Sequence, residues 1–173
     1  IARLELLIEI KQIFVVTNEL YAELIQAQIP HLPKRNIIIE PIGRNTAPCI
    51  GLASIFVEEQ YPDSTMIVLP SDHIIENEDG FLNILKTATE FSRNNNSVVT
   101  LGISPKYPET GYGYIESTTH TYTLNELRIH KVNRFVEKPD YVTAQNYLNA
   151  GNFYWNSGIF VWKTSTIRNA FKE

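Results

Sequence analysis

Short apolar runs alternate with amphipathic segments along most of the chain. Residues 13–16 form a continuous β-branched and aromatic run, which is typical of a strand buried on both faces. Residues 19–29 then repeat apolar side chains at helical spacing until Pro30 ends the pattern. This part of the sequence therefore predicts a strand followed by a helix.

The same alternation recurs further along the chain. It predicts strands over residues 37–39, 66–69 and 98–102, and helices over residues 46–60 and 80–93. Strands and helices that alternate in series favour a mostly parallel sheet flanked by helices, which is the α/β class.

The pattern changes after residue 103. Residues 112–116 and 127–137 indicate strands separated by a polar stretch, which fits either an antiparallel excursion or a small subdomain. A short helix over residues 140–149 and a buried strand over residues 157–162 are predicted next. We see no internal repeat, low-complexity tract or linker, so we expect one domain over residues 1–173.

Both ends of the sequence look incomplete. Residues 1–10 indicate an apolar helix with no capping residue in front of it. Residues 164–173 begin a helix that then stops. We therefore expect the chain to be a piece of a longer protein, truncated at both ends.

Composition argues against several classes of protein. Apolar residues make up 43% of the chain and charged residues 20%, and the formal net charge is −4. An acidic chain lacks the basic face that nucleic acids require, so we expect no nucleic-acid partner. The single cysteine, Cys49, cannot form an internal disulfide, and no apolar run reaches the ~18 residues of a membrane span. We expect a cytoplasmic protein with no membrane partner.

Two polar segments follow predicted strands, at the sheet edge where open parallel sheets bind their ligands. Asn45 and Thr46 stand at the start of the helix over residues 46–60, where N–H groups attract an anion, or where both side chains simply cap the helix. Asp72 follows the strand over residues 66–69, where it can hold Mg²⁺ or cap the next helix. Local evidence leaves both alternatives open at each segment.

Two more segments carry polar groups near the later strands. The Glu137 carboxylate can accept hydrogen bonds from sugar hydroxyls, and the Lys138 ammonium can reach a phosphate. The alternative for this pair is a solvated ion pair. Asn156 offers donors and an acceptor to a polyol, although its segment also fits a tight turn before a strand.

Five motifs in this order carry a specific resemblance. They are Glu-Pro-x-x-Arg-Asn-Thr-Ala-Pro at 40–48, Leu-Pro-Ser-Asp-His at 69–73, Glu-Thr-Gly-Tyr-Gly-Tyr-Ile at 109–115, Phe-Val-Glu-Lys-Pro at 135–139 and Trp-Asn-Ser-Gly-Ile-Phe at 155–160. The series resembles that of the mannose-1-phosphate guanylyltransferases, which are sugar nucleotidyltransferases. The resemblance implies a Rossmann-like nucleotidyltransferase fold, Mg²⁺ as cofactor, and conversion of GTP and mannose 1-phosphate to GDP-mannose and pyrophosphate.

The resemblance also implies a role for each matched residue. The implied roles are guanine-nucleotide binding for Arg44, Asn45 and Thr46, metal binding and catalysis for Asp72, sugar binding for Gly113, Glu137 and Asn156, and catalysis at the sugar phosphate for Lys138. The family's glycine-rich N-terminal loop and second metal-binding aspartate have no match in this sequence. The chain by itself is therefore expected to be inactive.

Two other functions stay open on the sequence alone. One is a nucleotidyltransferase for another sugar 1-phosphate or another base, because Glu137 and Asn156 would serve many hexoses. The other is a non-catalytic subunit that binds nucleotide sugars and regulates a partner. A homo-oligomer is compatible with each of these functions.

Overall fold

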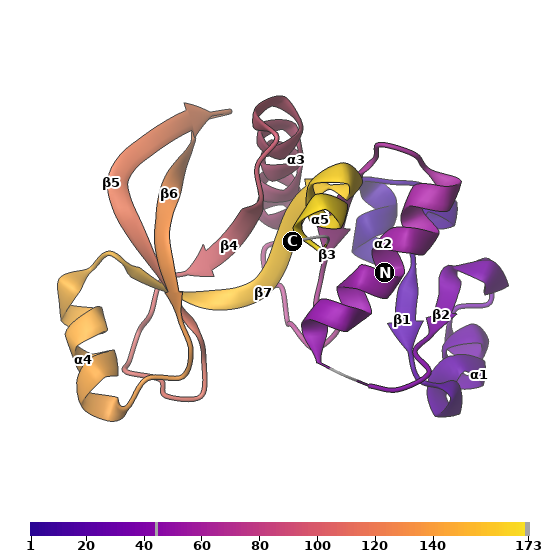
Figure 1. Cartoon of the computed structure of the whole chain (residues 1–173), viewed down its shortest axis with the longest axis horizontal. Coiled ribbons are helices and arrows are strands. Elements are labelled where there is room, and N and C mark those ends of the chain that lie inside the picture. Colours follow the sequence, from indigo (N-terminus) through magenta and orange to yellow (C-terminus); the bar gives the residue numbers. More distant parts are fainter. Residues whose placement is uncertain (44, 172–173) are drawn as a thin grey trace. The chain divides into compact units, whose positions relative to one another are not determined.

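The computed structural model describes residues 1–43 and 45–171 (Figure 1). The helices α1 to α5 cover Glu19–Gln28, Thr46–Gln60, Glu78–Asn95, Tyr141–Ala150 and Thr164–Ala170. The strands β1 to β7 cover Val15–Thr17, Ile37–Ile39, Thr65–Val68, Val99–Ile103, Tyr114–Leu124, Leu127–Val136 and Phe153–Lys163. This order of elements confirms the α/β class. Within the described ranges, no helix combines the length and the apolar character that crossing a membrane requires.

The predicted α-helix over residues 1–10 is wrong. Two short 3₁₀ helices, Ala2–Leu6 and Ile10–Gln12, stand there instead, and a third covers Lys34–Asn36. No side chain caps the first of them at Ile1. An apolar segment without a cap leaves its first N–H groups unpaired, which favours short pieces over a continuous α-helix.

The chain divides into two compact units. The first comprises Ile1–Met66, Ile74–Ser97 and the C-terminal segment that starts at Trp162. The second comprises Ile67–His73 and Val98–Val161. The expectation of one domain over the whole chain stays a prediction.

The first unit contains the parallel strand pair. β1 and β2 pair with Val16 opposite Ile38, which is buried. Asn36 is fully buried just before β2, and its amide donates to the backbone oxygens of Lys11 (2.8 Å) and Ile13 (2.7 Å). These two bonds tie the start of β2 to the backbone just before β1, so the buried amide helps to hold the two strands in one register.

The second unit is built from antiparallel pairs. β7 pairs with both β4 and β5, and β5 pairs with β6. The β5–β6 hairpin closes through Asn125 and Glu126, which both have positive φ (48° and 65°), with Leu124 opposite Leu127. A two-residue turn can join only antiparallel neighbours. The prediction of a mostly parallel sheet is therefore confirmed only in part.

The polar stretch between the two predicted strands of this hairpin belongs to β5. It extends β5 to Leu124, with most of its side chains exposed to solvent. Threonine is enriched in strands because its β-branched side chain fits a pleated surface. The sequence does not reveal this part of the strand because the stretch lacks the apolar alternation by which a half-buried strand is recognised.

Helix α4 packs against the start of this hairpin (Figure 1). Tyr114 and Ala144 are fully buried in a cluster with Phe153 and Trp155. Tyr147 of α4 stacks on Phe153 with ring centroids 3.9 Å apart. Burial of these aromatic rings holds α4, β5 and β7 together.

We expect the N-cap of α4 to make stability depend on pH. Asp140 accepts a hydrogen bond from the Thr143 N–H (2.8 Å), and this bond lowers the pKa of the Asp140 carboxyl. Because the pKa is lower in the folded state, the stabilisation is present above the unfolded value of about 3.9. It is lost as the pH falls through the folded value.

Asp140→Ala should therefore lower the urea midpoint at neutral pH, and this loss should shrink as the pH falls towards about 2. Asp140→Asn keeps an acceptor without the charge, so it should stay near wild type at neutral pH. Urea titrations across this range test the effect. An equal loss for Asp140→Ala at every pH would contradict it.

Candidate functional site

The three residues predicted to bind sugar meet in the second unit. Gly113 lies directly before β5, and its carbonyl oxygen accepts from the Asn156 N–H (2.8 Å). A Cβ added at Gly113 would lie 3.2 Å from Glu137 Oε2 and 3.7 Å from the Asn156 Cβ. Residues far apart in the sequence therefore form one small surface, on which any side chain at position 113 would intrude.

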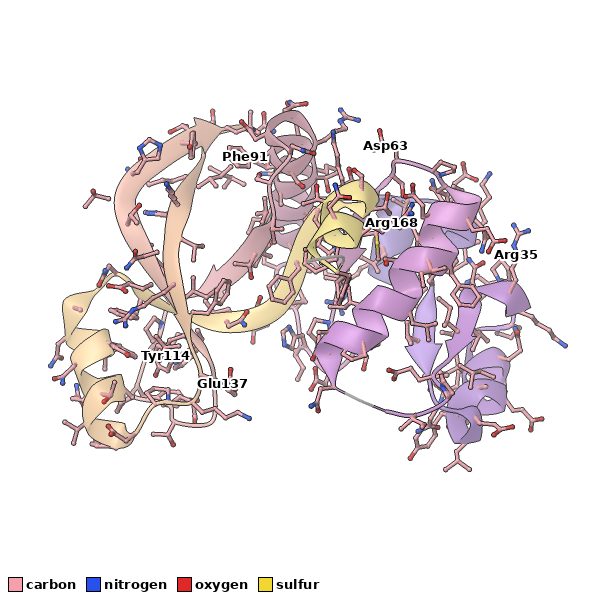
Figure 2. The ribbon with its side chains drawn as sticks, viewed as in Figure 1. Arg35, Asp63, Phe91, Tyr114, Glu137 and Arg168 are labelled. Carbon is pink, nitrogen blue, oxygen red and sulfur yellow. The ribbon has the colours of Figure 1, made fainter. Side chains whose placement is uncertain are left out.

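Strand register brings these residues together. Tyr114 is opposite Val136 of β6 and opposite Trp155 of β7. In antiparallel pairs the residue before Tyr114 then faces the residues after Val136 and after Trp155. Figure 2 shows Glu137 and Tyr114 at the same end of the hairpin, beside α4.

Lys138 belongs to the same surface. Its Nζ lies 3.6 Å from Glu137 Oε1, and both side chains are largely exposed, so the pair contributes little to stability. Lys138 has a φ of +37°, outside the extended conformation in which neighbouring side chains point to opposite faces. A strained backbone at a polar, exposed position is typical of functional sites.

The loop that carries Asp72 reaches this surface through Pro70. Gly158 has a φ of +71°, and a Cβ added there would lie 3.3 Å from the Pro70 Cγ. The Gly158 N–H in turn donates to Asn156 Oδ1 (3.1 Å). Contacts thus run from the Asp72 loop through Asn156 to Gly113 and Glu137.

Asp72 does not cap the following helix. The N-cap of α3 is Asn77, whose Oδ1 accepts from the Gly80 N–H (2.9 Å). The capping alternative for Asp72 is therefore wrong, and its exposed carboxylate is available to a ligand. In the described part of the chain, no cluster of three or more His, Cys, Asp or Glu side chains could hold a metal by itself.

Of the residues predicted to bind the nucleotide, Asn45 and Thr46 belong to the first unit. Arg44 lies outside the described residues. Asn45 is the N-cap residue of α2, which starts at Thr46. Asn45 has a φ of +65°, and its side chain makes no capping hydrogen bond, so the alternative that it simply caps the helix is not supported.

An aromatic cluster that the sequence patterns did not indicate lies beside this surface. Tyr107 and Tyr112 both pack edge-on against Trp155, with ring centroids 4.9 Å and 5.5 Å apart. Tyr112 precedes Gly113 and Trp155 precedes Asn156. Tyr112 and Trp155 thus each stand inside one of the five motifs, which is the sequence feature that could have indicated the cluster.

A concavity of about 510 Å³ lies elsewhere, on the β5–β6 hairpin. Its lining consists of Thr118, His120, Tyr122, Lys131, Val132 and Asn133. It lies where two extra β5 residues stand between the pairs Ser117–Val132 and Thr121–His130, a β-bulge in the hairpin. None of the predicted site residues lines this concavity, which is widely open to solvent. The candidate site is therefore identified by the contacts among the predicted residues and not by the size of a cavity.

Comparison with known proteins gives one family. The model of the family described as "Nucleotidyl transferase" matches residues 2–172. "Mannose-1-phosphate guanylyltransferase 2" of Escherichia coli O157:H7 is 42% identical over 158 residues, which cover 87% of this chain and 33% of that protein. The Klebsiella pneumoniae mannose-1-phosphate guanylyltransferase is also 42% identical, over 90% of this chain and 33% of its own length. The chain thus spans about a third of these curated relatives.

Solved structures share the fold. One from Thermus thermophilus, described as a mannose-1-phosphate geranyltransferase, has a TM-score of 0.84 at 27% identity, over 99% of this chain and 48% of that chain. One from Helicobacter pylori, described as a mannose-6-phosphate isomerase, has a TM-score of 0.82 at 29% identity, over 98% and 62%. The chain has the Rossmann-like nucleotidyltransferase fold that the resemblance of its motifs implies.

We expect Gly158→Ala to destabilise the protein more than Gly151→Ala. Both glycines have positive φ, so a Cβ costs each about 1–2 kcal/mol of backbone strain. A Cβ meets Pro70 at Gly158 and nothing within 4 Å at Gly151, which makes Gly151→Ala the control for strain alone. Urea unfolding measures both, and equal losses would contradict the contact between Pro70 and β7.

Proposed function

The chain belongs to the nucleotidyl transferase family, and from that premise we propose that its full-length protein is a mannose-1-phosphate guanylyltransferase. It would transfer GMP from GTP to mannose 1-phosphate and release pyrophosphate. Curated relatives about 40% identical to the chain, which bear that name, support the proposal. Because the chain spans about a third of them, the activity is proposed for the longer protein.

The meeting of Gly113, Glu137 and Asn156 carries the proposal. A carboxylate accepts hydrogen bonds from hydroxyl groups, and an amide can donate to them. Asn156 Oδ1 already accepts from Gly158, so its NH₂ group is left to donate to a sugar oxygen. The missing side chain at Gly113 leaves room for a ring to approach both groups.

Lys138 would bind the phosphate of the sugar. Its ammonium lies beside Glu137 and its side chain is 63% exposed, so it can turn towards a bound anion. A phosphate oxygen of mannose 1-phosphate attacks the α-phosphorus of GTP in line, and pyrophosphate leaves. The attacking oxygen is already anionic, so no general base is needed. The main obstacle is the repulsion between two polyanions, which a positive side chain reduces.

Nucleotidyltransferases of this family usually use a divalent metal. We assign Mg²⁺ to Asp72, whose exposed carboxylate follows β3. A single carboxylate fits Mg²⁺, which takes one or two protein ligands and fills its remaining positions with water and substrate phosphates. When bound, the ion supplies positive charge at the phosphates of the nucleotide.

Arg44, Asn45 and Thr46 would bind the guanine nucleotide. The first N–H groups of α2 have no partner within the helix and attract acceptor groups. The Asn45 side chain, which makes no capping bond, can pair with the base or ribose.

The lone cysteine Cys49 fits a reducing compartment such as the cytoplasm. A homo-oligomer stays a prediction.

The other functions that the sequence left open are not favoured. The curated relatives that support the proposal all carry mannose 1-phosphate and the guanylyl group in their names, which argues against another sugar phosphate or another base. Asp72 and Lys138 are both present, and a purely regulatory subunit would have no need of them.

In the full-length protein, Asp72→Asn should abolish turnover, with a loss on the order of 100-fold or more. The exposed amide keeps the shape of the loop, so the melting temperature should stay unchanged. Asp79→Asn, at an exposed acid in the first turn of α3, is the control and should keep full activity. Pyrophosphate release from GTP and mannose 1-phosphate measures both. Normal turnover in Asp72→Asn would end its assignment.

Lys138→Ala should raise the KM for mannose 1-phosphate about tenfold or more, because a phosphate loses its ammonium partner. The KM for GTP should change much less. Lys86→Ala, at an exposed lysine of α3, should match wild type. Steady-state kinetics with each substrate varied in turn provides the test. If Lys138→Ala left both KM values unchanged, the phosphate role would be wrong.

A further inference from the structure

Trp155 lies beneath two tyrosines from a single loop. Its side chain is buried, with 8% exposure, whereas Tyr107 and Tyr112 are each about half exposed. Both tyrosines present their rings to Trp155 at steep interplanar angles, 62° and 79°. Edge-to-face contacts of this kind are the favoured geometry for aromatic pairs. The loop over residues 104–113 is therefore packed on β7 through one tryptophan.

The same residue anchors both ends of that loop. β4 ends at Ile103, which is opposite Trp155, and β5 begins at Tyr114, which is also opposite Trp155. The Tyr114 hydroxyl donates to the Glu109 carbonyl oxygen (2.8 Å), which ties the middle of the loop to its end. The Gly111 N–H donates to the Glu109 carboxylate (2.7 Å). The path of the loop thus depends on contacts gathered around one position of β7.

The last residue of this loop is Gly113, whose carbonyl bonds to the N–H that follows Trp155. We propose that Trp155, Tyr107 and Tyr112 form an aromatic clamp that positions Gly113 against Asn156 for sugar binding. This inference rests on the proposed function, and it assigns positioning rather than catalytic roles. Loosening the clamp would let Gly113 move away from Asn156 and weaken binding of the sugar phosphate.

The clamp acts through ring contact. Within the described residues, Trp155 Nε1 is buried and has no hydrogen-bond partner. Replacing the indole by another aromatic ring therefore removes no bond, so Trp155→Phe should be tolerated better than Trp155→Leu. Tyr107→Phe keeps the ring that contacts Trp155, so it should behave like wild type, whereas Tyr107→Ala removes the ring and should not.

Kinetics of the full-length protein test the role. Tyr107→Ala should raise the KM for mannose 1-phosphate about fivefold to tenfold, the effect of losing one aromatic contact. The value of kcat and the KM for GTP should stay near wild type in this variant. Tyr107→Phe should have the wild-type KM for mannose 1-phosphate. Tyr107 is half exposed, so its removal should not unfold the protein. The control is Tyr21→Ala, at an exposed tyrosine of α1 in the first unit.

A spectroscopic arm tests the contact independently of activity. In fluorotryptophan-labelled protein, the ¹⁹F resonance of Trp155 is assigned as the one that disappears in the Trp155→Phe variant. Tyr107→Ala should shift this resonance and leave that of Trp162 in place. An unmoved Trp155 resonance would overturn the clamp, and a shift without any rise in the sugar KM would overturn its positioning role. If wild-type protein used no sugar phosphate at all, the proposed function would fail, while the resonance would still decide the contact.

Discussion

Tyr114 pairs with β6 on one side and with β7 on the other, and the candidate site depends on this double register. The side chain is fully buried against α4, so the strand cannot slide without exposing it. A slip of one residue would send every side chain of β5 to the opposite face. Gly113 would then no longer face Glu137 and Asn156. Burial of one tyrosine thus decides where a carboxylate and an amide meet.

The site gains its chemistry from groups that contribute little to the fold. Glu137, Lys138 and Asp72 are all exposed, and the ion pair between the first two adds little stability. Val136, directly before Glu137 and Lys138, packs against an apolar and aromatic cluster that contains Trp155 and Tyr114. This separation lets the polar surface rearrange around a charged substrate while the strands beneath it keep their register.

The proposed reaction would also account for both signs of charge at this surface. The two phosphorylated substrates of the proposed reaction would repel each other, and the ammonium of Lys138 and an ion held by Asp72 would lower the cost of bringing them together. Glu137, by contrast, would serve neutral hydroxyl groups, and the neighbouring Lys138 ammonium offsets its negative charge. A carboxylate that recognises sugar therefore need not repel the phosphate that the same sugar carries.

The sequence by itself determined the α/β class, the bounds of α2 and the order of the polar motifs, because these depend on local periodicity and on turn and cap residues. It did not reveal the antiparallel pairing of β4 to β7, nor the extension of β5 through its polar stretch. Pairing depends on contacts between residues distant in the chain, which local patterns do not encode. Only the tertiary structure decided that Gly113, Glu137 and Asn156 meet, and that Tyr107 covers Trp155. The physical reason is that strand register and burial, not spacing along the chain, set which side chains share a surface.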